Sequence, residues 1–297
     1  MTSTGSALAV PDWPLAFGKL IPAWEGGVRF EYGHRVVAGV VVIVMAALMV
    51  QMVRFEDRRW VRNVAIAAFG LIIVQAILGG ITVLLEIPLA IAIAHSATAQ
   101  AFFCLTVAMA VFTSDWFEAA PHLDEPHERP SLTFLTTLTT ALIYLQILVG
   151  ALVRHLGAGL SIPDFPLSFG RLIPPTWDLY IAANFAHRCG AVIVTCLIVW
   201  TCVRVMRSHA DRRELIRPAR ALLGLLLLQL ALGAITIWSE REVLPTTAHV
   251  AIGAAVLATT LMLAIRAWRL YGATAPATAI DRSARSAGDV LQPRATA

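Results

Sequence analysis

Long runs of apolar residues, separated by short polar stretches, fill most of this chain and define its predicted elements. Each run is continuous rather than alternating, which favours helices over strands. Seven runs are long enough to cross about 30 Å of hydrocarbon as α-helices. They lie near residues 33–53, 63–85, 88–113, 133–154, 182–206, 217–238 and 245–266. The pattern therefore predicts an all-α integral membrane protein.

The polar stretches between these runs repeat along the chain. Residues 11–22 match residues 163–174 at nearly every position, including a shared Pro-Asp-aromatic-Pro. The sequence Glu-Tyr-Gly-His-Arg at residues 31–35 is echoed by Asn-Phe-Ala-His-Arg at residues 184–188. One repeat spans four membrane crossings, an even number, so the two copies run parallel. We predict two tandem four-helix-bundle halves related as a parallel pseudo-repeat.

The repeat also sets the expected domain boundaries. An N-terminal half covers residues 1–113, an inter-half loop 114–132, a C-terminal half 133–268 and a disordered tail 269–297. In the second copy the 163–174 loop follows a span at 133–154. The equivalent helix of the first copy would precede residue 1. We therefore expect the first half to lack its first helix in this chain.

Composition and charge agree with a membrane location. The chain is 58% hydrophobic and 14% charged, whereas soluble domains have about 45–50% apolar and about 25% charged residues. The net charge of +4 arises from arginines in short loops, so it does not indicate nucleic-acid binding. The positive-inside rule places the arginine-rich loops near residues 54–62 and 204–220 in the cytoplasm. The same rule allows the organellar equivalent of the cytoplasm, and in either case the loops at 1–32, 155–181 and 239–244 lie outside. We expect a multi-pass protein of a bacterial inner membrane, with the histidine-bearing helix ends on the extracytoplasmic side.

Four histidines lie toward the predicted outer ends of the spans and form two pairs. His34 and His95 are 61 residues apart, and His187 and His249 are 62 residues apart. Polar side chains within a membrane are costly and usually functional, although a histidine that only bonds to a neighbouring helix is the alternative. Zinc requires more protein ligands than a pair provides. Two facing imidazoles suit the axial positions of a haem, so each half is predicted to hold one haem.

Three further positions near the histidines carry candidate chemistry. Arg35 and Arg188 directly follow their histidines, and a guanidinium is well shaped to bind a haem propionate. The alternative is that they reach to the membrane interface, and the two interpretations weigh about evenly. Glu31 lies one turn before His34, whereas its counterpart is Asn184. Glu31 could serve proton-linked chemistry, or it could stabilise the helix N-terminus or pair with Arg35.

Two recurring phrases complete the pattern. Glutamine followed by glycine four residues later occurs three times, at residues 75–79, 146–150 and 229–233. Small residues at this spacing allow helices to approach closely in lipid, so we predict a packing role, with the glutamine near a bound ligand. The Pro-Asp-aromatic-Pro loops predict tight, rigid turns. If these loops cover a cofactor, Lys19 or Arg171 could meet its acidic groups.

Taken as a set, these motifs resemble the haem A synthase family. The shared features are the outer-loop motif, Glu-x-x-His-Arg before an apolar helix, the four histidines and the duplication, and they extend from residue 3 to about 268. The resemblance implies eight spans and oxidation of the C8 methyl of haem O to a formyl group, which gives haem A for cytochrome oxidase. Many relatives carry cysteine pairs flanking the outer-loop motif. Those positions are here Val10, Ala16, Ile162 and Ser168, so no outer-loop thiol chemistry is expected.

The resemblance also implies roles for individual residues and partners. His34 and His95 would ligate the substrate haem, His187 and His249 would ligate a haem b, and Glu31 would be catalytic. Haem b would relay electrons from an unidentified donor toward the N-terminal site. Haem O synthase and cytochrome oxidase assembly factors are expected partners in the lipid bilayer, and a homo-oligomer is an open possibility. The alternatives are a dihaem b-type cytochrome that only transfers electrons, and a transporter or assembly chaperone without enzymatic activity.

Overall fold

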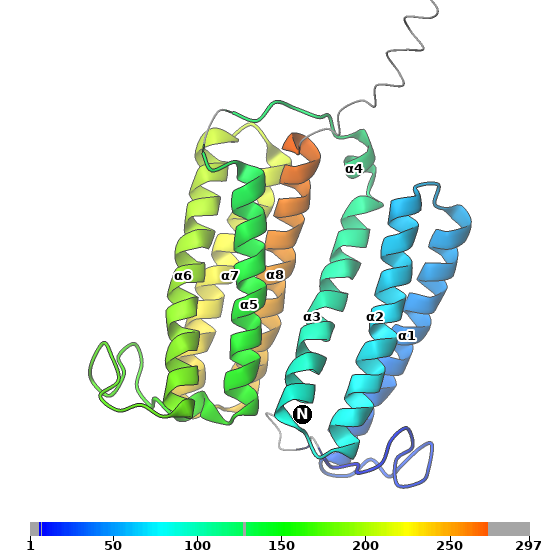
Figure 1. Ribbon diagram of the computed structural model, residues 1–297, viewed down its shortest axis with the longest axis vertical. Helices are drawn as coiled ribbons and strands as arrows, with labels where there is room; N and C mark the ends of the chain where they lie inside the picture. The colour runs from blue at the N-terminus through cyan, green and yellow to red at the C-terminus, as the bar shows by residue number, and fades with distance from the viewer. Residues whose placement is uncertain (1–5, 7, 127–128, 273–297) are drawn as a thin grey trace, which may run out of the picture.

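Seven long helices run side by side in the computed structural model, which describes residues 6, 8–126 and 129–272 (Figure 1). All seven are long and apolar enough to cross a membrane, which confirms the predicted spans. The predicted tail beyond residue 272 lies outside the described residues. The long helices are α1 Val28–Phe55, α2 Arg59–Leu84, α3 Leu89–Phe112, α5 Leu132–His155, α6 Leu179–Ser208, α7 Arg213–Trp238 and α8 Val243–Tyr271.

The helices form two groups that follow the repeat (Figure 1). Helices α5 to α8 form a four-helix bundle, and the described part of the first half contributes α1 to α3. Helix α3 packs against both α5 and α8 and so joins the groups. The link between the halves contains the short helix α4, Asp115–Ala119. Two long loops, residues 8–27 and 156–178, lie at one end of the molecule, which we call the loop end.

Capping residues and left-handed turns define where the helices begin and end. The Asp178 carboxylate accepts the backbone N–H of Ile181 at 2.8 Å and starts α6, as expected for an N-cap aspartate. Helices α2 and α7 end in equivalent turns, with positive φ at Glu86 and Ile87 and at Glu240 and Arg241. A left-handed conformation stops a helix and satisfies its last carbonyl groups. The repeat is therefore preserved in backbone detail.

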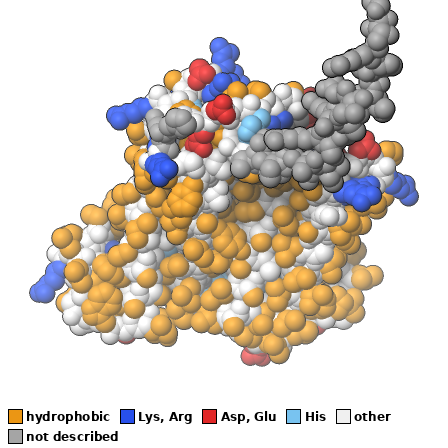
Figure 2. All heavy atoms as spheres, turned by 45° about the horizontal axis from the view of Figure 1, so that its top comes forward, with side chains coloured by type: hydrophobic (Ala, Val, Ile, Leu, Met, Phe, Trp, Pro, Cys, Tyr) orange, Lys and Arg blue, Asp and Glu red, His pale blue; other side chains and the backbone are white. Residues whose placement is uncertain are grey.

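The helix surfaces are strongly apolar. Figure 2 shows a largely orange surface over the sides of the helices, with most of the charged side chains in view toward the top of the picture. Many large apolar side chains point outward, for example Ile43 at 70% and Leu227 at 70% exposure. Such exposure suits lipid contact, because lipid tails are as apolar as these side chains.

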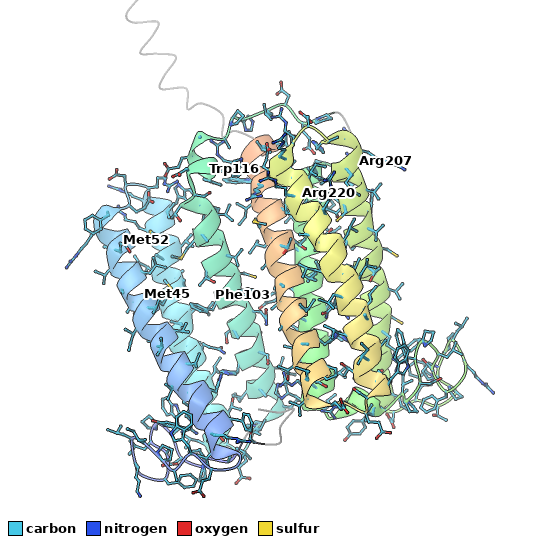
Figure 3. The ribbon with its side chains drawn as sticks, turned by 180° about the vertical axis from the view of Figure 1, so that it is seen from behind. Met45, Met52, Phe103, Trp116, Arg207 and Arg220 are labelled. Carbon is cyan, nitrogen blue, oxygen red and sulfur yellow. The ribbon has the colours of Figure 1, made fainter. Side chains whose placement is uncertain are left out.

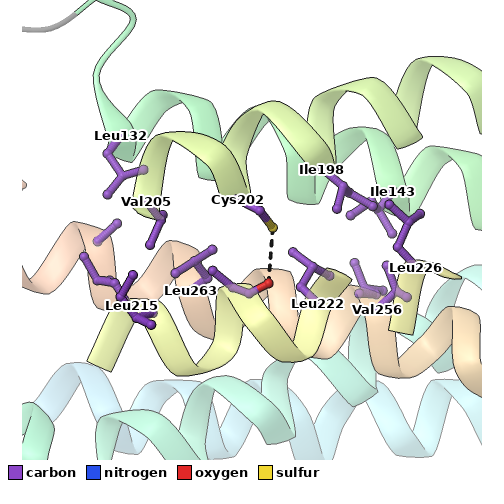
Figure 4. Packing of buried hydrophobic residues seen from close by; sticks show 14 of the residues in the cluster. Leu132, Ile143, Ile198, Cys202, Val205, Leu215, Leu222, Leu226, Val256 and Leu263 are labelled. Carbon is purple, nitrogen blue, oxygen red and sulfur yellow. Dashed lines mark hydrogen bonds between the residues drawn. The ribbon is translucent and has the colours of Figure 1, made fainter. Parts of the chain in front are cut away.

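A dense core fills only one part of each half. In the C-terminal bundle it contains leucines, isoleucines and valines from all four helices, and the Cys202 thiol donates to the Ala219 carbonyl at 3.3 Å (Figure 4). On each helix, its buried members lie on the side away from the loop end. A smaller core in the first half includes Met45 of α1 (Figure 3). The fully buried C-terminal members are Leu132, Ile198, Cys202, Val205, Leu215, Ala219, Leu222, Leu257, Leu263, Ala267 and Leu270.

The core predicts which apolar positions hold the bundle together. Ile198 is fully buried between helices, whereas Ile193 on the same helix is 56% exposed. We expect Ile198→Ala to lower the free energy of unfolding by about 2–5 kcal/mol, because it leaves a cavity. Ile193→Ala removes the same atoms from a lipid-facing position and should cost far less. Thermal unfolding followed by tryptophan fluorescence would measure both; equal losses would contradict the assignment of the core.

Candidate functional site

The four predicted histidines lie within the first three turns of four different helices, all at the loop end. His34 is on α1, His95 on α3, His187 on α6 and His249 on α8. Within each half the two rings are close enough to influence each other electrostatically, His34 with His95 and His187 with His249. The structure therefore brings together the pairs that the spacing predicted.

A backbone carbonyl holds the Nδ1 atom of one histidine in each half. His95 Nδ1 lies 3.2 Å from the Gln75 carbonyl oxygen, and His249 Nδ1 lies 3.2 Å from the Gln229 carbonyl oxygen. A carbonyl only accepts hydrogen bonds, so the proton must be on Nδ1. The lone pair is then on Nε2, which is the state that a metal-binding imidazole requires.

His187 is held differently. Its Nδ1 lies 3.0 Å from the side-chain nitrogen of Gln146, which also donates to the His187 carbonyl at 2.7 Å. The side chain of the fourth histidine, His34, makes no hydrogen bond to another described residue, and this histidine is exposed. Three of the four histidines thus have a glutamine as their neighbour.

In each Gln-x-x-x-Gly phrase, the glycine leaves space for the histidine that the glutamine of that phrase contacts. A Cβ atom added at Gly79 would lie 3.0 Å from Cε1 of His95, and one at Gly150 would lie 3.0 Å from Cε1 of His187. At Gly233 the distance to Cε1 of His249 would be 3.1 Å. We call each glutamine with its glycine a histidine seat. The sequence predicted that these glycines let helices pack closely. The structure shows that each of them also leaves space for a histidine ring.

The glutamine side chains reach the coordinating edge of the rings. The Gln75 amide nitrogen lies 3.3 Å from His95 Nε2, and the Thr98 hydroxyl donates to the Gln75 amide oxygen. The Gln229 amide nitrogen lies 3.4 Å from His249 Nε2. With the proton on Nδ1, these amide N–H groups are placed to donate to the lone pair on Nε2.

Arg35 uses its guanidinium to fasten the first outer loop. Its Nη1 donates to the carbonyl oxygens of Asp12 and Leu15 at 2.7 and 2.9 Å. Its Nη2 donates to the Val10 carbonyl at 3.1 Å and to the Glu31 carboxylate at 2.7 Å. The loop therefore folds back over the start of α1.

Arg188 repeats this arrangement in the second half. Its Nη1 donates to the carbonyl oxygens of Asp164 and Leu167, both at 2.8 Å, and its Nη2 donates to the Ile162 carbonyl at 2.9 Å. Its Nε donates to the Asn184 amide oxygen at 2.9 Å. Sequence analysis singled out both arginines but did not foresee that loop carbonyls are their partners.

The two halves differ at the residue one turn before the first histidine. Glu31 is fully buried, and its carboxylate accepts from Arg35 and from the Val10 backbone N–H at 3.0 Å. Asn184 is 4% exposed and donates its amide to the carbonyl oxygens of Ala158 and Gly159. Glu31 thus places a buried carboxylate beside the N-terminal histidine pair. Its ion pair with Arg35 is one of the alternatives predicted from the sequence.

The outer loops form the tight turns that the sequence predicted. Residues 16–19 and 168–171 close with paired backbone hydrogen bonds. In the first, φ is positive at Phe17 and Gly18, as in type I′ hairpin turns. Asp12 accepts both of their N–H groups, at 2.7 and 2.8 Å. The backbone N–H groups of Gly18 and Phe17 lower the pKa of Asp12, since they favour the ionised form.

The first outer loop packs next to the histidine seat of its own half, against Gly80. A Cβ at Gly80 would lie 2.6 Å from the Trp13 ring, so only glycine fits there. Gly80 directly follows Gly79, which contacts His95. The counterpart positions in the second half are Ala234 and Phe165, a larger residue on the helix and a smaller ring on the loop. The exchange keeps the combined volume similar.

The donor set of the paired histidines fits the axial positions of a haem. Among the described residues there is no group of three or more His, Cys, Asp or Glu side chains that could hold a metal ion. A haem brings its own four equatorial nitrogens and needs only axial ligands. The paired histidines, with Nε2 available on His95 and His249, fit this requirement.

Comparison with known proteins gives one family. The sequence pattern of the family described as cytochrome oxidase assembly protein matches residues 24–107 and 99–261. A haem A synthase of Symbiobacterium thermophilum is 31% identical over 231 residues, covering 75% of this chain and 74% of the relative. Haem A synthases of Staphylococcus haemolyticus and Staphylococcus aureus are 28% and 26% identical, each covering 84% of this chain and 82% of the relative.

The histidine seats predict a glycine requirement. In Gly79→Ala and Gly233→Ala the added methyl groups would displace His95 and His249, so each variant should lose most of the haem bound by its own half. Gly70→Ala and Gly224→Ala lie on the same helices with nothing within 4 Å of the added Cβ, and they serve as controls. Haem content and the low-spin absorption spectrum measure the effect. Equal haem content in all four variants would refute the seats.

The aspartate turns predict an acid-sensitive loop. The N–H groups of Gly170 and Phe169 lower the pKa of Asp164 below its ordinary value of 3.8. This carboxylate therefore stabilises the loop at pH values above about 3.8, and the stabilisation is lost as the pH falls through the lowered pKa. Hydrogen exchange of residues 163–174, corrected for intrinsic rates, should show protection falling below pH 3.8. Asp164→Asn should be less protected at pH 7 and lose this pH dependence; an unchanged profile would contradict the assignment.

Proposed function

The chain belongs to the haem A synthase family of cytochrome oxidase assembly proteins, and on this premise we propose how its two halves divide the reaction. It is a multi-pass membrane oxidoreductase of haem A biosynthesis, and its substrate is haem O. The dihaem cytochrome alternative is not favoured by the relatives. The observation that carries the proposal is the repeated histidine pair, with a buried Glu31 beside one pair and Asn184 beside the other.

We assign the N-terminal pair, His34 and His95, to the substrate haem. The exposed side chain of His34 and its lack of a described hydrogen-bond partner suit a ligand that must receive and release a substrate. The C-terminal pair, His187 and His249, is assigned to a haem b that stays bound. Both rings pack against the glycine of a seat, and the backbone carbonyl at Nδ1 of His249 leaves the Nε2 lone pair of that ring for iron, which supports a permanent site.

Glu31 is the proposed catalytic residue of the N-terminal half. In the proposed reaction the C8 methyl is converted to a formyl group by successive hydroxylation and loss of water, and a haem b held by His187 and His249 would supply one-electron redox chemistry. Glu31 would accept protons or stabilise positive charge that develops near the oxidised carbon. Its carboxylate lies one turn from His34 and is held in place by Arg35 and the Val10 N–H.

The proposed propionate contacts of Arg35 and Arg188 remain predictions. Their guanidinium groups bind loop carbonyls and the side chains of Glu31 and Asn184. We propose that they first of all position the outer loops over the histidine-bearing ends of α1 and α6. Charged hydrogen bonds of this kind contribute about 1.5–3 kcal/mol each, enough to fix a loop.

The remaining assignments concern the surroundings of the enzyme. We propose a bacterial inner membrane with the loop end on the extracytoplasmic side, since the arginines of the other end would then obey the positive-inside rule. Arg207 and Arg220 lie at that end (Figure 3). Haem O synthase as supplier, oxidase assembly factors as receivers, an electron donor and a homo-oligomer are proposed partners.

The proposal is tested by haem extraction and chromatography. Cells that express this chain together with a haem O-producing enzyme should show a haem A peak that a matched culture without the chain lacks. Purified protein that carries haem B, with no haem A formed in the cells, would contradict the synthase activity and support an electron-transfer cytochrome.

Variants separate the two halves. We expect His34→Ala or Glu31→Ala to abolish haem A formation while haem b remains bound, because the C-terminal pair is intact. His187→Ala should remove haem b. His122→Ala, in the exposed inter-half loop, is the control and should change neither. Haem A yield and haem b content measure both effects, and equal loss of haem b in all three site variants would refute the division of labour.

A further inference from the structure

Two arginines lie close together at the loop end of the C-terminal half. Arg154 is in the last turn of α5, and Arg241 is in the turn between α7 and α8. The Arg241 side chain lies against Gly159, whose turn packs on α5, and the two guanidinium groups are close enough to repel each other.

Arg154 continues the stripe of residues that holds His187. Gln146, Gly150 and Arg154 are spaced by four residues on one side of α5, and the first two contact His187. Arg154 is therefore one turn, about 6 Å, beyond the glycine that faces the ring. Side chains on a helix lean toward its N-terminus, which brings the Arg154 side chain back toward the histidine.

Arg241 lies near Arg154 but belongs to the turn that follows α7, the helix that carries the Gln229–Gly233 seat. It follows Gln229 and Gly233 and has a left-handed backbone, with φ of 69°, a conformation that is costly for a residue other than glycine. Its side chain passes over Gly159, where an added Cβ would lie 3.1 Å from the Arg241 Cδ. In the C-terminal half, an arginine therefore follows each of these two seats along the chain: Arg154 follows Gly150, and Arg241 follows Gly233.

These two cations have no acidic partner among the described residues. Neither forms an ion pair or a side-chain hydrogen bond there, and the Arg154 Nε is buried without any partner. A buried, unpaired donor on a charged group is costly, and a second positive charge nearby increases the cost. An anion between the two arginines would remove both penalties.

We infer that Arg154 and Arg241 form the anion-binding part of the C-terminal haem site and bind the carboxylates of the haem held by His187 and His249. This inference rests on the proposed function. A guanidinium is suited to bind a carboxylate through two hydrogen bonds. The location one turn beyond a histidine seat favours a carboxylate of that haem over the phosphate of a lipid.

The inference would also account for the proposed difference between the halves, in which only the C-terminal half keeps its haem. Arg241 corresponds to Ile87 in the first half, and the two residues have the same left-handed backbone, with φ of 69° and 63°. The first half therefore has an apolar side chain where the second has a cation. Weaker binding of the haem carboxylates suits a site that must release its haem. A cation that binds them suits a site that retains its haem.

The test compares haem with its dimethyl ester, in which both carboxylates are neutralised. The full-length protein, carrying His34→Ala and His95→Ala so that only the C-terminal site remains, is prepared from haem-deficient cells and titrated with each compound. We expect it to bind haem about tenfold or more tightly than the ester. Adding Arg154→Gln and Arg241→Gln should abolish this preference. Adding Arg207→Gln instead, an exposed arginine at the opposite end of the bundle from the histidines, should leave it unchanged.

Each other outcome overturns the inference. If the Arg154→Gln/Arg241→Gln protein and the Arg207→Gln protein show the same preference for haem over the ester, the inference is refuted while the proposed function stands. Titration in nanodiscs with and without phosphatidylglycerol tests the lipid phosphate. If that lipid stabilises the parent but not the double arginine variant, and the ester preference is unchanged, the arginines bind lipid instead. A parent protein that binds no haem refutes the inference and the proposed haem b site together.

Discussion

An imidazole that donates its Nδ1 proton to a fixed acceptor keeps the lone pair on Nε2 for iron, and within a membrane such an acceptor has to come from the protein. In this molecule the partners come from the backbone. The carbonyl groups of Gln75 and Gln229 receive Nδ1 of His95 and His249, and the glycine one turn later lets the ring approach the helix. This close approach accounts for glycine at positions 79 and 233, and Trp13 of the outer loop lies against the neighbouring Gly80.

The loop arginines provide the second constraint. Arg35 and Arg188 bind carbonyl oxygens of a turn that is itself closed by an aspartate, so each outer loop is tied to the helix that carries the first histidine. The cysteine positions of related proteins are occupied here by Val10, Ala16, Ile162 and Ser168, all of which are buried. In this chain packing and arginine contacts hold the loop.

The spans, the parallel repeat and the histidine pairs could be predicted because they depend on local composition and on constant spacing. The distance of 20 residues from Gln75 to His95 and from Gln229 to His249 was the signal for the seats. Sequence alone predicted only packing there, since the pairing depends on the register of two helices across the bundle. The partners of Arg35, and the proximity of Arg154 to Arg241, required contacts between segments far apart in the chain. The roles assigned to individual site residues stay predictions.

The unequal distribution of the core has a consequence for biogenesis. Large apolar side chains interlock on the side away from the loop end, while the histidines and small residues occupy the other side. Helix association in lipid depends on such close packing, so the bundle can assemble without its cofactor. Folding and haem loading are then separate events, and an apoprotein with a formed scaffold can wait in the membrane until haem arrives.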